Sequence, residues 1–132
     1  MADEPYDFIR GIDLFSEVSD KDLKVIASSL KRRAYAPGDT IVSEGEGGVG
    51  FFFVQSGDVA VTKDGRRLVT LGHGDYFGEI ALLAGADRTA TVSAESEVVC
   101  WGMPAWSFRP LVREQPSVTV KLLERMARQL SG

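Results

Sequence analysis

The sequence predicts a mainly β domain, a barrel or sandwich of short strands, with helices before and after it in the chain. Twelve of the 14 glycines lie between residues 35 and 103, where they are typical of tight turns between strands. The same region contains short runs of aromatic and β-branched residues, too short for helices. The glycine-poor ends instead show helical spacing of apolar residues. Together these patterns favour strands in the middle and helices at both ends.

Length and composition indicate one globular domain over residues 1–132. The chain is 44% hydrophobic and carries 15 basic and 19 acidic side chains, a formal net charge of −4. A single Cys and a single His exclude a disulfide framework and a zinc site of the usual Cys/His spacing. The mildly acidic balance argues against a protein that coats nucleic acid, and we expect no nucleic-acid partner for this chain, although the composition leaves room for a local basic patch. With neither an apolar run of membrane-spanning length nor a signal-peptide pattern, we expect a cytoplasmic protein without a membrane span.

The N-terminal segment, about residues 1–33, is expected to be helical. Its main helix covers about 19–32, with Ser19 as N-cap, after a short turn over 14–18. One face of this helix is apolar, formed by Leu23, Ile26, Ala27 and Leu30.

Residues 34–103 are expected to form the β region. Pro37-Gly38-Asp39 is a predicted turn, and Asp64-Gly65 predicts a hairpin over residues 63–66. The expected strands are 40–44, 51–54, 58–62, 68–71, 88–94 and 98–103.

Residues 104–130 are expected to form two helices. The first runs from Pro104 to about Glu114 and ends before Pro116, and the second covers 117–130. The second helix has an apolar stripe that faces either the core or a partner, and its basic residues are interpreted as a solvated face. The stripe consists of Val118, Leu122, Met126 and Leu130 beside Leu123, and the basic residues are Lys121, Arg125 and Arg128.

Three features that resemble chemical motifs have simpler explanations. Residues 45–50 fit the pattern G-x-G-x-x-G, but aromatic residues typical of a strand follow it, whereas dinucleotide binding requires a helix there. His73 lies between two glycines, without a nearby nucleophile to serve, and is assigned to a turn. Cys100 is assigned to the core of a strand.

The residue types in segment 74–92 are difficult to explain by a purely structural role. Residues 79–84 predict a helix of only about a turn and a half, whose first amides lack partners inside the helix and suit a phosphate. Arg88 then enters an apolar strand, which is costly unless an anion pairs with its planar guanidinium. Glu79 makes sense as an acceptor for a sugar hydroxyl, because an ionised carboxylate only accepts hydrogen bonds. The alternative is a structural ion pair between Glu79 and Arg88.

These residues resemble the phosphate-binding cassette of the cyclic nucleotide-binding domain family. The cassette is matched by residues 77–83, Phe-Gly-Glu-Ile-Ala-Leu-Leu, and by residues 88–92, Arg-Thr-Ala-Thr-Val. The resemblance extends to residues 37–39, 45–46, 52–57 and 74–76, and so covers nearly the whole chain.

The resemblance implies an antiparallel β-roll of jelly-roll type, with an N-terminal helical region and two C-terminal helices. It also implies that Glu79 accepts a bond from the ribose 2′-hydroxyl and that Arg88 holds the cyclic phosphate. The amides of Ala81, Thr89 and Ala90, with the Thr89 hydroxyl, would complete the phosphate site. The other expected ligand-binding residues are Gly78 and Ile80 of the cassette, and Val61 and Leu71 as apolar walls.

The implied function is a regulatory sensor, not an enzyme, with a cyclic nucleotide as ligand and no other cofactor. cAMP is favoured, and cGMP is allowed because Thr89 stands where the family associates a hydroxyl with tolerance of guanine. The last helix would pass the signal to an effector domain or a homodimer partner, in a free-standing module or a piece of a larger regulator. Two alternatives are a cupin-like metal enzyme, disfavoured by the single His, and a degenerate module used for protein contacts.

Overall fold

The computed structural model describes residues 4–42, 50–85 and 90–131. Contacts within the chain divide it into two compact units, one of Met1–Ser29 with Trp106–Gly132 and one of Leu30–Ala105. Among the described residues, no helix combines the length and the apolar character that crossing a membrane requires.

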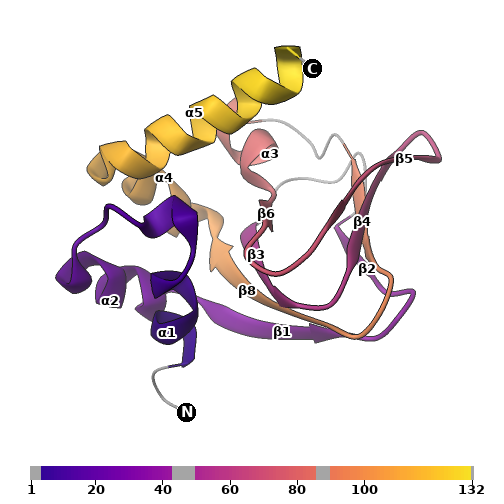
Figure 1. The fold of residues 1–132 in the computed structure, drawn as a ribbon, viewed down its shortest axis with the longest axis horizontal. Helices are drawn as coiled ribbons and strands as arrows, with labels where there is room; N and C mark the ends of the chain where they lie inside the picture. The colour runs from indigo at the N-terminus through magenta and orange to yellow at the C-terminus, as the bar shows by residue number, and fades with distance from the viewer. Residues whose placement is uncertain (1–3, 43–49, 86–89, 132) are drawn as a thin grey trace. The chain divides into compact units, whose positions relative to one another are not determined.

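The unit Leu30–Ala105 is built from two four-stranded antiparallel sheets. Its strands are β1 (Lys31–Tyr35), β2 (Thr40–Val42), β3 (Gly50–Ser56), β4 (Val59–Lys63), β5 (Arg66–Leu71), β6 (Tyr76–Phe77), β7 (Thr91–Ala94) and β8 (Val98–Pro104). One sheet has the order β1-β8-β3-β6 and the other β2-β7-β4-β5 (Figure 1). The predicted mainly β architecture of short antiparallel strands is confirmed.

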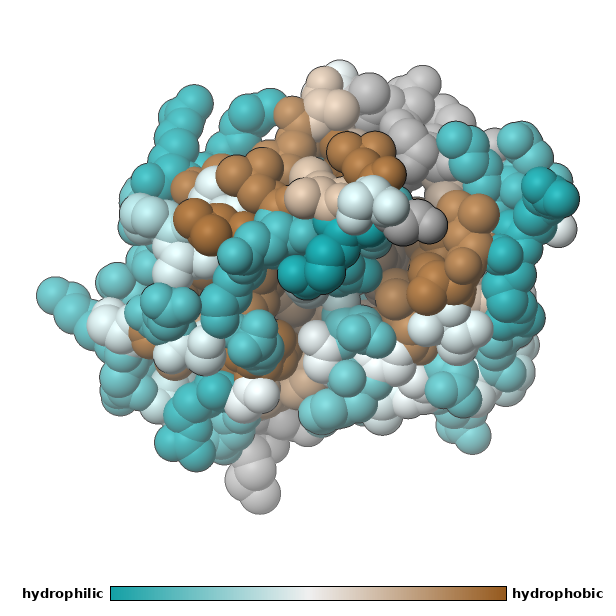
Figure 2. Space-filling view, turned by 45° about the horizontal axis from the view of Figure 1, so that its top comes forward, coloured by the Kyte–Doolittle hydropathy of each residue, from teal (hydrophilic) through white to brown (hydrophobic). Residues whose placement is uncertain are grey.

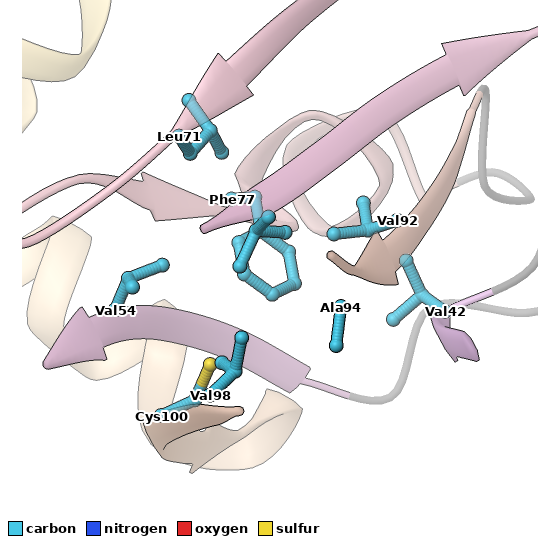
Figure 3. Close-up of a cluster of buried hydrophobic side chains, with 9 residues drawn as sticks. Val42, Val54, Leu71, Phe77, Val92, Ala94, Val98 and Cys100 are labelled. Carbon is cyan, nitrogen blue, oxygen red and sulfur yellow. The ribbon is translucent and has the colours of Figure 1, made fainter. Parts of the chain in front are cut away.

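Buried side chains from both sheets form the core of this unit (Figure 3). Val54 and Cys100 come from one sheet, and Val59 and Val92 come from the other. Full burial of an apolar side chain stabilises a fold by roughly 1.5–3 kcal/mol, so this shared cluster holds the sheets together. Burial raises the pKa of the Cys100 thiol to about 12, which confirms a structural rather than a reactive cysteine.

Two predicted turns are confirmed by their backbone angles. Asp64 and Gly65 both have positive φ, 53° and 77°, as a two-residue hairpin turn requires. In the turn before β2, Gly38 has a φ of 92°, and the Asp39 carboxylate accepts a hydrogen bond of 2.8 Å from the Ala36 amide. At each turn, the residues of the turn itself therefore determine where the chain reverses direction.

The prediction is wrong where the first helical segment meets the β region. The expected helix over 19–32 is shorter, because α2 ends at Ser28 and β1 begins at Lys31. The hydroxyl of Ser29 bonds to the carbonyl oxygen of residue 26 at 2.7 Å, which occupies an acceptor at the helix end and favours termination there. The expected boundary at residues 33 and 34 therefore falls inside β1, and the two-residue β6 also lies outside the predicted strands.

The other unit is helical. It contains α1 (Glu4–Arg10), the short 3₁₀ helix η1 (Asp13–Phe15), α2 (Asp20–Ser28), α4 (Ala105–Glu114) and α5 (Pro116–Ser131). The predicted cap is confirmed, since the Ser19 hydroxyl accepts a hydrogen bond of 3.2 Å from the Asp22 amide. The two C-terminal helices have the expected positions, whereas α1 is absent from the prediction. The phenol of Tyr6 hydrogen-bonds to the Asp20 carboxylate and so joins α1 to α2.

Lys121 joins α5 to η1. Its ammonium group donates to the carbonyl oxygen of Asp13 at 2.7 Å and to the Ser16 hydroxyl at 2.6 Å. It also lies 3.6 Å from the Asp13 carboxylate and 3.8 Å from the Glu17 carboxylate. The Lys121 side chain is only 18% exposed, so the predicted solvated face of α5 is wrong at this residue.

The apolar stripe of α5 divides into two parts. Val118 and Leu122 are buried in the core, 0% and 2% exposed, whereas Leu123 and Leu130 are 59% and 90% exposed. Figure 2 shows a face of the molecule on which hydrophobic side chains reach the surface among polar ones. The core interpretation therefore holds for the start of the stripe, and the partner-facing interpretation stays a prediction for its end.

Candidate functional site

The turn between β5 and β6 is held by hydrogen bonds that backbone amides donate to one side chain and to main-chain oxygens. The Asp75 carboxylate accepts a bond of 2.9 Å from the Gly72 amide. The Val54 amide donates to the carbonyl oxygen of Asp75 at 2.8 Å, and the Gly74 amide donates to that of Val54 at 2.9 Å. His73 is exposed in this turn, with its Nδ1 atom 2.7 Å from a main-chain oxygen of β3. The predicted turn assignment of His73 is confirmed.

β6 then fixes where the next helix begins. Its residues Tyr76 and Phe77 pair with Phe53 and Phe52 of β3. The Phe77 side chain is 6% exposed and belongs to the core cluster. Because β6 is held through both its backbone and its side chains, the residue that follows it, Gly78, has a defined position.

Gly78 turns the chain from β6 into α3 (Glu79–Ala84). It has a φ of 101° and a ψ of −11°, a left-handed conformation that is strained for residues with a side chain. A second left-handed glycine, Gly85 at a φ of 65°, ends the helix, and its amide donates to the carbonyl oxygen of Ala81. The predicted helix of about one turn and a half is confirmed, bounded by two glycines.

Glu79 is the first residue of α3 and is 4% exposed. Burial of a carboxylate is costly unless its oxygens accept hydrogen bonds or face a positive charge. The first amides of a helix have no acceptor within it, and the partial positive charge there favours an anion. The β6–α3 corner thus combines a buried acceptor with backbone donors, the two kinds of group that a phosphorylated sugar requires.

The two predicted apolar wall residues lie on one face of their sheet. Val61 on β4 faces Val69 on β5 and Val92 on β7, and Leu71 faces Val59 two pairs further along. Residues directly opposite each other, and alternate residues of one strand, point to the same face of a sheet. These five side chains therefore form a continuous apolar surface in which Leu71 is buried and Val61 is half-buried.

Val69 belongs to this surface but lies outside the predicted site. Regular pairing from the Asp64-Gly65 turn would place Leu68 opposite Val61. The pairing instead shifts by one residue beyond Thr62, and Val69 takes that place. Sequence alternation carries no sign of such a bulge, so the pattern alone could not identify Val69.

The remaining expected residues are only partly within the described chain. Gly78, Glu79, Ile80 and Ala81 lie together at the β6–α3 corner, with Ile80 partly exposed. Ala90 is half-buried in a bend directly before β7. Arg88 and Thr89 lie outside the described residues, as do residues 45–49 of the glycine-rich pattern.

The chain is similar in sequence to cAMP-dependent protein kinase regulatory subunits and to cGMP-dependent protein kinases. A family model, described as the cyclic nucleotide-binding domain, matches residues 32–115, more than half of the chain. The cAMP-dependent protein kinase regulatory subunit of Debaryomyces hansenii is 43% identical over 94 residues, which are 70% of this chain and 21% of that protein. The cGMP-dependent protein kinase of Toxoplasma gondii is 38% identical over 118 residues, 84% of this chain and 12% of that protein. The chain thus spans less than a quarter of the length of either curated relative.

Solved structures share the fold along nearly the whole chain. The structure of PKAR CBD2 with Sp-2Cl-cAMPS bound has a TM-score of 0.83 and 28% identity, covering 96% of this chain and 86% of that one. The catabolite activator protein of Thermus thermophilus has a TM-score of 0.79 and 30% identity, covering 89% of this chain and 58% of that one. These neighbours confirm the expected β-roll with flanking helices. The sequence match over residues 32–115 and the shared fold together show that this chain belongs to the cyclic nucleotide-binding domain family.

Proposed function

We propose that residues 1–132 form one regulatory module that binds a cyclic nucleotide, cAMP in preference to cGMP, and relays its presence through α4 and α5. The observation that carries the proposal is the buried carboxylate of Glu79 at the start of α3, within the residues that the family model matches. The relatives include both a cAMP-dependent regulatory subunit and a cGMP-dependent kinase, so the proposal admits either nucleotide.

In the proposed complex, two charged side chains hold the two halves of the cyclic sugar phosphate. Glu79 accepts a hydrogen bond from the ribose 2′-hydroxyl, and the planar guanidinium of Arg88 pairs with the phosphate oxygens. The amides of Ala81, Thr89 and Ala90, with the Thr89 hydroxyl, complete the phosphate contacts. Ala81 is the third residue of α3, so its amide has no acceptor inside the helix, which supports this role.

The remaining site residues shape the pocket. Gly78 and Ile80 set the corner from which Glu79 projects, with Gly78 supplying the left-handed turn. Val61 and Leu71 form the apolar wall for the nucleotide, and the register adds Val69 to it. A few charge-assisted contacts, net of the cost of binding, give an expected dissociation constant of about micromolar.

The module works by binding, without catalysis, and no cofactor besides the nucleotide is needed. The kinase names of the relatives support an effector such as a catalytic kinase domain as the receiver of the signal. A second copy of this chain bound through α5 is the other expected receiver, and the exposed Leu123 and Leu130 support contact at that end. We expect this signalling to take place in the cytoplasm.

Calorimetric titration of the full chain with cAMP, cGMP and 5′-AMP tests the proposal. We expect binding of the cyclic nucleotides and weaker or no binding of 5′-AMP. The Glu79→Gln variant should bind cAMP about tenfold or more weakly, because a charge-assisted hydrogen bond is lost. Glu97→Ala removes an exposed carboxylate of the same unit and serves as the matched control. If the wild-type chain binds neither cyclic nucleotide, the degenerate-module alternative is correct and the proposal is wrong.

A further inference from the structure

The edge strand β1 carries three consecutive cations, Lys31, Arg32 and Arg33. All three are exposed. Within residues 4–42, 50–85 and 90–131, no carboxylate forms an ion pair with any of them. The whole chain has a net charge of −4, so this cluster is a local feature rather than part of a generally basic protein.

The backbone of β1 has a free side. Among the residues that the structure describes, β1 is the end strand of its sheet and pairs only with β8. In an antiparallel pair, alternate residues turn both their amide and their carbonyl away from the partner strand. The backbone hydrogen bonds of the described residues include none to this free side of Lys31–Tyr35. β1 therefore presents donors and acceptors to which a further strand can bond.

The three cations lie on both faces of this edge. Lys31 and Arg33 are two residues apart and so point to one face, whereas Arg32 points to the other. The strand register supports this assignment, because directly opposite residues point to the same face. Arg33 lies opposite the core residue Cys100, whereas Arg32 lies opposite the neighbouring residue Trp101 and so points to the other face. A strand added beside β1 would meet positive charge on each of its own faces. It would be matched best by consecutive acidic residues, not by an alternating pattern.

Charge decides which kind of strand fits. Exposed cations on an edge oppose pairing with a second copy of the same edge, because like charges would face each other. The same cations attract a strand of opposite charge. We propose that β1 is a docking edge for an extended acidic segment of a partner protein, which adds as a strand beside Lys31–Tyr35. This inference is independent of the proposed nucleotide site.

A labelled peptide tests the inference by fluorescence anisotropy with the full chain. The probe has three consecutive Glu between Val and Thr residues. One companion peptide replaces the Glu residues by Lys, and another keeps them but is N-methylated at alternate positions, which removes backbone donors. We expect the acidic probe to bind with a dissociation constant of about 10–100 μM at low salt, and both companions to bind at least about tenfold more weakly.

Charge reversal locates the binding edge. The double variant Arg32→Glu/Arg33→Glu should bind the acidic probe at least about tenfold more weakly than the wild type. The matched control Lys63→Glu/Arg66→Glu reverses two exposed cations of the other sheet and should bind like the wild type. Probe binding should also slow amide exchange of residues 31–35 in the wild type. This measurement needs no variant and remains decisive if the double variant fails to fold.

Any one of several results would overturn the inference. They include absence of probe binding to the wild type, equal binding by the charge-reversed β1 variant, equal binding of either companion peptide, and unchanged amide exchange over residues 31–35. Tighter binding of an RNA oligonucleotide or of anionic phosphatidylserine vesicles through the same cations would show that the partner is not an acidic strand.

Discussion

The ring of Phe77 stacks on the ring of Phe52, with centroids 5.1 Å apart and an angle of 16° between the ring planes. Phe77 is the last residue of β6, two positions before Glu79. It also belongs to the core cluster shared by both sheets (Figure 3). The position of the candidate site therefore depends directly on the packing of the β core.

Phe77→Leu should lower the free energy of unfolding by about 1–1.5 kcal/mol, since the stacked ring is lost but most of the volume is kept. The same change should weaken cAMP binding, because Glu79 loses part of its support. Urea denaturation and calorimetry measure the two effects. Trp106→Leu, at a side chain 80% exposed, is the control and should change neither. Wild-type stability and affinity in Phe77→Leu would contradict the link between core and site.

Gly78→Ala should strain the corner that leads into α3. With a φ of 101° at this position, a Cβ atom costs about 1–2 kcal/mol, and relief of the strain would move Glu79. We expect reduced stability together with reduced cyclic nucleotide affinity. Gly11→Ala is the matched control, because Gly11 lacks a positive φ and an added Cβ would meet its nearest atom at an ordinary 3.7 Å. The explanation fails if the two variants unfold and bind alike.

We expect the ion pair between Arg67 and Glu95 to make a pH-dependent contribution to stability. Their side chains form a two-bond ion pair, with Nη1 to Oε1 at 2.6 Å, that joins β5 to the turn after β7. The hydrogen bond from Arg67 lowers the pKa of Glu95 below its ordinary 4.5. A carboxyl group with a lowered folded pKa stabilises the protein above its unfolded pKa, and this contribution is lost as the pH falls through the folded pKa.

Glu95→Gln should therefore be less stable than the wild type at neutral pH, by a small amount because both side chains are partly exposed. The difference should shrink as the pH falls below 4.5. Thermal denaturation of both proteins across this range measures it. A difference that stays constant with pH would show that the pair contributes nothing through ionisation.

Lys121→Met should loosen the attachment of α5 to η1. Two hydrogen bonds from a largely buried ammonium group are lost, for which we expect about 1–2 kcal/mol of destabilisation. Amide exchange in the middle of α5 should become faster. Arg128→Met changes an exposed cation of the same helix and should leave exchange as in the wild type. Equal exchange in both variants would mean that Lys121 does not hold the helix.

Local signals explain most of what the sequence predicts correctly. Ser19 caps α2, and Asp64-Gly65 forms a turn, because each depends on the chemistry of one or two residues. The short helix after Gly78 follows in the same way from a glycine pair and an apolar run. The buried position of Glu79 agrees with the interpretation of the cassette as a binding site, although the roles of Arg88 and Thr89 stay predictions.

Features set by pairing between distant residues escape the sequence patterns. The sequence of β1 is predicted in part as the polar end of the preceding helix. An edge strand exposed on both faces lacks the alternation of apolar residues by which strands are recognised. Val69 replaces Leu68 in the apolar wall through a bulge that alternation does not reveal. Lys121 contacts η1 across more than one hundred residues, a partner that helical spacing alone does not indicate.

We propose that Arg88 binds the cyclic phosphate and that Glu79 binds the ribose. Calorimetric titration with cAMP tests this proposal most directly. Arg88→Ala should bind about tenfold or more weakly than the wild type, because the phosphate loses its charged partner. Arg66→Ala, which removes an exposed arginine at the β4–β5 hairpin, should bind within about twofold of the wild type. Unchanged cAMP affinity in Arg88→Ala would contradict the proposed site.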